Sequence, residues 1–319
     1  MSIKFNSIDI QDKLNNLEID DEKNITIFYG KKIDERSDAI HDYFQKNGSI
    51  RNSYEIYYIQ NDDSFYINNL PIKKNKFNEI ELNKLINTSF KIILDSTTLS
   101  YIEIITILFY LNKLKKNFKV DIYYVEPLEY TNEKVGFHEQ QFHLSYDSGN
   151  LSYIKPFYLD EPLDNINKDK AAIITFIGFE DDRLATVLDI DDFNKIYQDV
   201  FPIISIPGFQ YGWENISLTN HIDLLGKMKL YYSPADNPYA SYQLLKRLIN
   251  DIGYNQIVLM PFGTKPNTVA SAIFMINYKE SYDLDKNQPI LATQFDFPVK
   301  KPKRTKGIKE VHQYKLTIN

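Results

Sequence analysis

Short apolar runs rich in β-branched residues alternate along this chain with stretches in which apolar residues recur every three or four positions. The runs predict strands, and the second pattern predicts helices. Their alternation is typical of an α/β fold with mainly parallel sheets. In the first part of the chain we expect strands at 25–29, 54–59, 91–94 and 120–125, and helices at 34–46, 78–85 and 99–115.

A second series begins near residue 169, after a region in which this pattern is lost. Residues 171–177 are continuously apolar, which is typical of a strand buried on both faces of a parallel sheet. We expect residues 290–297 and 308–318 to form a terminal antiparallel pair. Between residues 177 and 290, further strands are expected at 202–206, 230–232 and 256–260, and helices at 181–188, 238–250 and 266–275.

The predicted fold class is α/β, with two Rossmann-like halves of mainly parallel sheet, an irregular β-rich central insertion and a C-terminal antiparallel strand pair. The predicted domains are an N-terminal half at 1–125, the insertion at 126–168, and a C-terminal half with a terminal β-hairpin at 169–319. Sheets of this kind bind ligands at the carboxyl ends of their strands. The loops after the predicted strands are therefore the first candidates for a site.

Composition and charge narrow the function classes. The chain is 43% hydrophobic and 25% charged, and its net charge of -6 argues against a general nucleic-acid binder. The absence of cysteine excludes disulfides, thiolate zinc sites and cysteine nucleophiles. No apolar run reaches the roughly 18 residues of a membrane span, and the polar N-terminus is unlike a signal peptide. We expect a cytoplasmic protein without membrane association, and the abundance of Asn, Lys, Ile and Tyr suggests a bacterial source.

The most informative motif is Gly263-Thr264-Lys265, which follows a predicted strand and opens a helix of small residues. A helix N-terminus carries unpaired N–H groups and partial positive charge, so this turn suits an anion, most often a phosphate. We expect Gly263 to adopt a backbone conformation that other residues avoid. The spacing is not that of a Walker A loop, so P-loop NTPase activity is not expected. The alternative is a plain strand-to-helix turn with a solvated lysine.

A second candidate, Asp95-Ser96-Thr97-Thr98, stands between a predicted strand and a predicted helix. Asp95 falls at the carboxyl end of the strand, the usual place for a ligand. Capping of the helix explains one hydroxyl, but not an acid together with three hydroxyls. We therefore expect Asp95, Thr97 and Thr98 to contact a ligand, with simple capping as the alternative.

Two loops of the second half add further candidates. Glu180 and Asp182 stand among acids at a predicted helix start, where the helix dipole favours them. Metal binding by these two carboxylates is the alternative. In the loop after 202–206, Phe209 and the single Trp213 can stack on a base or fill a small core.

The chain also has a dense basic run between its two terminal strands. Such a run can contact nucleic acid or an acidic partner protein, and this basic hairpin is the only part of the chain for which nucleic-acid contact is considered. The alternative is a solvated turn whose charges oppose aggregation. The residues are Lys300, Lys301, Lys303, Arg304 and Lys306.

The loops at Asp95–Thr98 and Gly263–Thr268 together resemble those of the CARF family, which are Rossmann-like sensor domains of prokaryotic antiviral systems. Ligand loops of that family often carry a Gly-Thr-Lys triplet that opens a helix. The resemblance implies a nucleotide ligand, bound as a cyclic oligonucleotide at a dimer interface. No effector domain, such as a HEPN helix bundle, is recognisable in the chain, so the resemblance implies a sensor that acts through a separate partner.

Three functions remain open from the sequence. The first is a nucleotide-binding sensor or accessory protein of a bacterial antiphage defence system, with a nucleotide ligand, no other cofactor and no metal. It would act through a protein partner or as a homodimer. The second is a Rossmann-like hydrolase of nucleotide glycosidic or phosphate-ester bonds, with Asp95, Glu126 or Glu180 as general acid or base. The third is a structural subunit of a multiprotein complex.

Overall fold

The computed structural model describes residues 2–12, 24–87, 89, 91–131, 133–135, 139–142, 144–146, 149–158, 171–190, 193–226, 228–285 and 288–319. The chain divides into two compact units. Unit 1 consists of Met1–Thr131 and Pro302–Asn319, and unit 2 consists of Asn132–Lys301. The chain therefore leaves unit 1 after Thr131, forms all of unit 2, and returns to unit 1 at Pro302.

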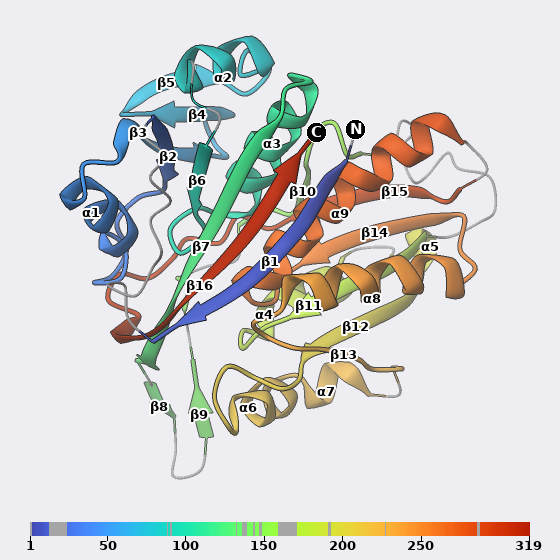
Figure 1. The fold of residues 1–319 in the computed structure, drawn as a ribbon. Coiled ribbons are helices and arrows are strands. Elements are labelled where there is room, and N and C mark those ends of the chain that lie inside the picture. Colours follow the sequence, from blue (N-terminus) through green and yellow to red (C-terminus); the bar gives the residue numbers. More distant parts are fainter. Residues whose placement is uncertain are drawn as a thin grey trace. The chain divides into compact units, whose positions relative to one another are not determined.

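Unit 1 is built on one mixed sheet (Figure 1). Its described helices are α1 (Ala39–Lys46), α2 (Glu79–Ile86) and α3 (Tyr101–Lys113). Its strands are β1 (Ile3–Gln11), β2 (Ile25–Tyr29), β3 (Ile50–Ile59), β4 (Ser64–Ile67), β5 (Leu70–Lys73), β6 (Lys91–Asp95), β7 (Phe118–Tyr130) and β16 (Thr305–Ile318). They lie in the order β1-β16-β7-β6-β2-β3-β4-β5.

The centre of this sheet is parallel and both sides are antiparallel. Strands β7, β6, β2 and β3 run parallel, whereas β16 and β1 on one side, and β4 and β5 on the other, pair antiparallel. The chain order reverses between β2 and β6, which makes a switch point at their carboxyl ends. There the backbone N–H of Gly30 donates to Thr98 Oγ1 at 2.8 Å. A side chain at Gly30 would come within 2.7 Å of the Thr98 carbonyl oxygen, so glycine is required.

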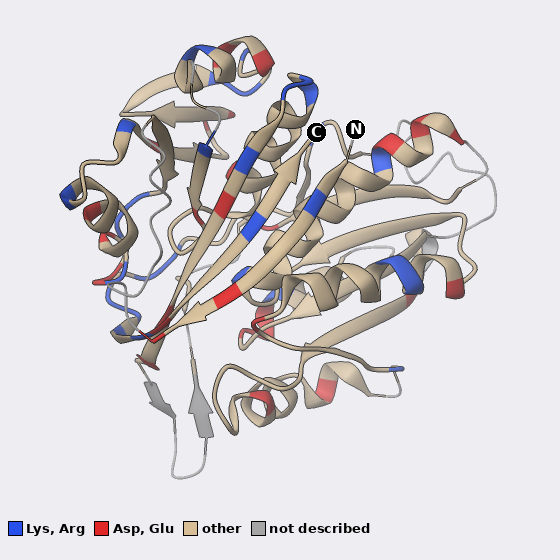
Figure 2. Cartoon of the chain, viewed as in Figure 1, with Lys and Arg blue, Asp and Glu red and all other residues tan. Residues whose placement is uncertain are grey.

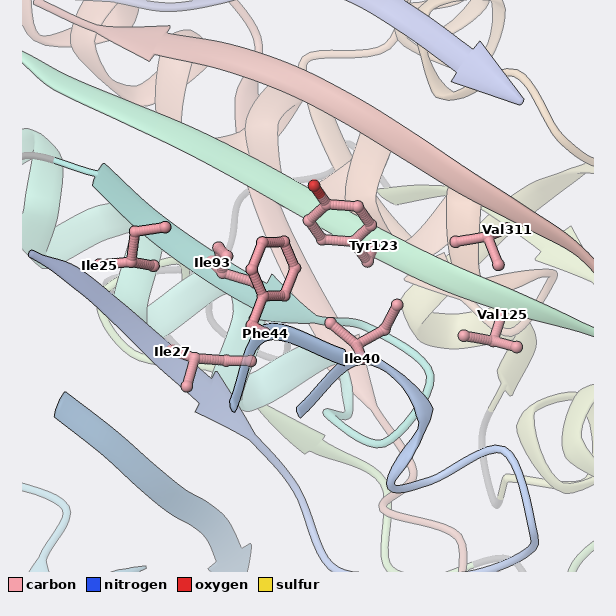
Figure 3. Close-up of a cluster of buried hydrophobic side chains, with 8 residues drawn as sticks. All are labelled: Ile25, Ile27, Ile40, Phe44, Ile93, Tyr123, Val125 and Val311. Carbon is pink, nitrogen blue, oxygen red and sulfur yellow. The ribbon is translucent and has the colours of Figure 1, made fainter. Parts of the chain in front are cut away.

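A cluster of apolar side chains holds α1 against the parallel strands. Ile40 and Phe44 of α1 face the sheet, where the cluster continues through four strands (Figure 3). Burial of each large apolar side chain contributes about 1.5–3 kcal/mol, so this cluster is a main source of stability in unit 1. The sheet residues of the cluster are Ile25, Ile27, Ile93, Tyr123, Val125 and Val311.

Unit 2 contains a second, larger series of alternating strands and helices. Its described helices are α4 (Asp182–Leu188), α5 (Phe193–Ile196), α6 (Trp213–Asn220), α7 (Ile222–Leu225), α8 (Pro238–Asp251) and α9 (Lys265–Leu284). Its main sheet has β10 (Ser152–Tyr153), β11 (Ala171–Ile177), β12 (Tyr197–Ser205), β13 (Tyr231–Ser233), β14 (Gln256–Pro261) and β15 (Ile290–Phe295). The strands β8 (Glu133–Val135) and β9 (Glu139–Gln141) form a separate ribbon.

The main sheet of unit 2 is doubly wound. Its order is β10-β15-β14-β11-β12-β13, and β11 to β15 are all parallel. Counted from β11, the parallel strands lie in the order 3-2-1-4-5, as in the Rossmann fold. The order reverses between β11 and β14, so the two loops that follow these strands meet at a switch point.

The predicted α/β class is confirmed, with a parallel series of strands in each of the two main sheets and an antiparallel C-terminal strand. The predicted partner of that strand is wrong, because β15 pairs parallel with β14 and β16 lies antiparallel between β1 and β7. The connection from β15 to β16 carries the chain from unit 2 into unit 1 and does not form a hairpin turn. The last strand thus belongs with the first half of the chain, and the expected boundary at residue 125 falls inside β7.

The pattern of polar and apolar residues also did not predict β1. A bulge between Phe5 and Ser7 shifts the pairing of β1 with β16, and this shift interrupts the alternation that marks a strand. Among the described residues, no helix combines the length and the apolar character that crossing a bilayer would need.

Candidate functional site

The carboxyl edge of the unit 2 sheet gathers most of the candidate residues of the second half. Gly178 follows β11, residues 206–212 follow β12, residues 234–237 follow β13, and residues 262–264 follow β14. Because all four strands are parallel, these loops emerge at one edge of the sheet. Four segments that are distant in sequence therefore contribute to one place.

Two glycines allow the loops at the switch point to approach closely. A Cβ at Gly178 would lie 3.0 Å from the carbonyl oxygen of Phe262, and a Cβ at Gly263 would lie 2.8 Å from Asn267 Oδ1. The φ of Gly263 is outside the left-handed region, so the expected special backbone conformation is wrong. Gly263 is needed because its neighbours leave no room for a side chain.

Thr264 is the N-cap of α9, as its position in the motif suggests. Its Oγ1 accepts from the Asn267 N–H at 3.4 Å, and the Asn267 side chain accepts from the Thr264 N–H at 3.0 Å, which is a reciprocal capping box. Thr264 Oγ1 also lies 2.8 Å from the Ala235 carbonyl oxygen, to which it can donate. The cap thereby ties the loop after β14 to the loop after β13.

Asn267 is the centre of this edge, a role that its local sequence does not indicate. Its side chain is fully buried; Oδ1 accepts from Ser205 Oγ at 2.9 Å, and Nδ2 donates to Ser241 Oγ at 2.9 Å. Ser241 in turn lies 2.7 Å from Ser233 Oγ. Asn267 thus connects the ends of β12 and β13 with the starts of α8 and α9.

The starts of α8 and α9 favour an anion at this edge. Neither first turn contains an acidic residue, so no carboxylate of these turns neutralises the positive end of either helix dipole. Lys265, the first residue of α9, adds a full positive charge on a half-buried side chain. Asn237 caps α8 by accepting from the Ala240 N–H at 2.9 Å.

Arg183 does not contribute a charge to this edge, because Asp296 holds it. Its Nε donates to Asp296 Oδ2 at 2.6 Å in a two-point ion pair, and its Nη1 donates to the Phe262 carbonyl oxygen at 3.1 Å. The Asp296 side chain is 2% exposed. Arg183 therefore fixes the loop after β14 from the side of β15.

Glu180 lies in the loop after β11, close to Ser145. Ser145 Oγ donates to Glu180 Oε2 at 3.2 Å. Burial raises the pKa of Glu180, Asp182 raises it further, and the charge of Arg183 lowers it. Asp182 is exposed, and among the described residues neither carboxylate belongs to a group that could hold a metal.

Trp213 packs mainly against other aromatic rings. Its ring centroid lies 5.8 Å from that of Phe179 and 6.4 Å from that of Phe142, and both contacts are edge-on. Trp213 and Phe209 are half-buried. The stacking of a base on either ring stays a prediction.

In unit 1, the polar atoms of the Asp95–Thr98 turn bond to one another and to nearby strands. Asp95 accepts from the Thr97 N–H at 2.9 Å and from Thr98 Oγ1 at 3.1 Å. Thr97 Oγ1 accepts from the Val125 N–H at 3.0 Å. Asp95, Thr97 and Thr98 are all buried, so these contacts account for a turn that closes the switch point of unit 1. The two loops that resemble CARF loops thus lie on different sheets.

Glu126, the remaining candidate acid, is buried on β7 in unit 1. It lies beside Lys309 and His312 of β16. Sequence pattern does not predict this neighbourhood, because β16 lies far from β7 along the chain.

The basic run lies on the connection from β15 to β16 and on the start of β16, not in a terminal hairpin. Lys300 and Lys301 belong to unit 2, whereas Lys303, Arg304 and Lys306 belong to unit 1. Lys301 Nζ lies 5.8 Å from the ring centroid of Tyr146. Contact of these residues with nucleic acid or a partner stays a prediction.

No family model matches this chain, and neither the curated proteins nor the solved structures give a match of significance. The function must therefore be argued from the site itself.

The burial of Asn267 predicts a large effect on stability. Asn267→Ala removes the partner of several buried polar groups, and we expect it to destabilise unit 2 by roughly 2–4 kcal/mol. Urea unfolding followed by the fluorescence of the single Trp213 measures this. Asn277→Ala is the matched control on the same helix, since its Nδ2 makes a 3.3 Å bond to Tyr242. An equal loss in both variants would contradict the role given to Asn267.

Because the pKa of Glu180 is raised, its replacement by the neutral glutamine should increase thermal stability by an amount that depends on pH. Because the folded state holds the Glu180 proton more tightly than the unfolded state, its contribution to stability is present at low pH and lost as pH rises through the folded pKa. Glu180→Gln should raise the melting temperature at pH 8 by about 2–4 °C and by little at pH 4. Asp223→Asn, at an exposed carboxylate of the same unit, is the control. A gain that is larger at pH 4 would refute this assignment.

Proposed function

We propose that this protein is a nucleotide-binding sensor or accessory protein, and that a phosphate of its ligand binds at the start of α9. The main support for the proposal is the position of one sequence motif in the fold. The Gly263-Thr264-Lys265 turn lies at the switch point of a doubly wound sheet, where ligands of such sheets bind.

The charges at this place support an anionic ligand. The dipole of α9, a helix of 20 residues, and the ammonium of Lys265 act in the same direction. Arg183 does not compete for the anion, since Asp296 neutralises it.

The base of the nucleotide would contact the aromatic residues that follow β12. Phe209 and Trp213 are half-buried and belong to the same unit as Lys265. Asp95 and Thr97 are left out of the proposed site, because they lie in unit 1 and bond within their own turn.

A role in bacterial antiphage defence, in the cytoplasm, and action through a protein partner or a homodimer are further parts of the proposal. Their support is the resemblance of the Gly263–Thr268 loop to the ligand loops of CARF sensors. The hydrolase alternative has less support at this edge, because the Glu180 carboxylate accepts a hydrogen bond from Ser145.

Ligand-dependent thermal stabilisation tests the proposal. ATP, AMP and a cyclic oligoadenylate are added to the full chain, and at least one should raise the melting temperature, since a ligand that binds only the folded state stabilises it. Lys265→Ala should weaken that nucleotide by about 10- to 100-fold, the effect of losing a charge-assisted bond. Lys279→Ala, on the same helix but away from its start, should bind normally. Stabilisation by none of the three, or equal affinity in Lys265→Ala, would overturn the proposal.

A further inference from the structure

A second group of polar side chains lies in unit 1, where β7 and β16 run together. Glu126 of β7 and Glu310 and His312 of β16 each offer one ligand atom, and these three atoms lie within 4.8 Å of one another. Figure 2 shows acidic positions where these two strands meet, with basic positions on nearby loops. The group is independent of the site proposed in unit 2.

A β-bulge creates this arrangement. Ile308 pairs with Pro127 and Val311 pairs with Val125, so two residues of β16 stand opposite the single residue Glu126. Such an extra residue re-aims the neighbouring side chains, and bulges are frequent beside functional sites. Without the bulge, Lys309 and Glu310 would not both lie next to Glu126.

The group is buried and already attracts positive charge. The Glu126 side chain is 1% exposed; its Oε1 accepts from Lys309 Nζ at 2.9 Å, and its Oε2 lies 3.2 Å from His312 Nε2. Glu310 is less buried, with its side chain 31% exposed, and its Oε2 lies 3.9 Å from Lys309 Nζ. The lysine ammonium thus stands where a cation can serve two carboxylates.

Two carboxylates, those of Glu126 and Glu310, share a single lysine ammonium in this group. A divalent cation between the two carboxylates would offset their repulsion more strongly than one ammonium does. Lys309 can make room, because its side chain is 33% exposed and long enough to turn towards water.

We propose that Glu126, Glu310 and His312 bind one divalent transition-metal ion, with Lys309 as the cation that it displaces. An imidazole nitrogen with two carboxylates suits Zn²⁺ or Mn²⁺, whereas Mg²⁺ and Ca²⁺ prefer oxygen ligands alone. Three protein ligands leave a coordination position for water, as in metal sites that activate water. The inference replaces the expectation from the sequence that the chain has no metal site.

Isothermal titration of the full chain with ZnCl₂, MnCl₂ and MgCl₂ tests the inference. We expect one Zn²⁺ or Mn²⁺ per chain, and much weaker binding of Mg²⁺. Glu310→Gln and His312→Gln should each weaken the ion by at least about tenfold. Lys309→Met should tighten it, because the competing ammonium is gone, and this gain separates a built site from casual binding at surface carboxylates.

Glu129→Gln and Lys306→Met serve as controls on the same two strands and should leave the affinity unchanged. Circular dichroism checks that each variant is folded. If His312→Gln does not fold, Glu310→Gln still tests the site, because Glu310 is only half-buried. Absence of Zn²⁺ and Mn²⁺ binding to the wild-type chain would overturn the inference. So would unchanged affinity in Glu310→Gln, or weaker affinity in Lys309→Met.

Discussion

Unit 1 depends on the pairing of β16 with β1 and β7. This last strand is 14 residues long. It pairs on one side with β1, the first strand, and on the other with β7, the strand that leads out of the unit. It also completes a buried polar network: Lys91 Nζ lies 2.6 Å from Asp121 Oδ2, and Gln313 of β16 donates to the same oxygen at 2.9 Å. Such an ion pair inside a sheet needs every partner, because an unpaired buried charge is costly. Unit 1 can therefore be completed only after the whole of unit 2 has been synthesised, and Glu126 acquires Glu310 and His312 by the same pairing.

Unit 2 is held together by different contacts. Its sheet is of the doubly wound kind, and the ends of its parallel strands are held by one buried amide, Asn267. With Ser205, Thr264 and Ser241 bound to it, the loops after β12 and β14 and the start of α8 have fixed positions. A site whose backbone is fixed in advance loses little entropy when it binds a ligand. We therefore propose two kinds of chemistry for the two units, an anion site at a helix start in unit 2 and a cation site between strands in unit 1.

The sequence predicted those parts of this structure that depend on local pattern. The apolar runs of β6, β11 and β14 were found because strands inside parallel sheets are buried on both faces, and Thr264 was placed at a helix start because capping is a local interaction. Glycine is required at position 263, as the motif predicts, but not because of an unusual backbone conformation. It is required because Phe176 and Asn267 lie too close to leave room for a side chain. Asn267 and the Glu126 group were missed because their roles are made by partners tens to hundreds of residues away. The terminal pairing was wrong for the same reason, since an alternating pattern does not say which strand is the neighbour.

We propose above that the switch point of the unit 2 sheet binds a nucleotide phosphate. The most direct measurement is an amide NMR titration of the deuterated full chain with ATP and with a cyclic oligoadenylate. We expect the largest early shifts on Gly263, Thr264 and Lys265, and on Gly178 across the switch point. The absence of shifts, or shifts confined to unit 1 loops such as Asp95–Thr98, would contradict it.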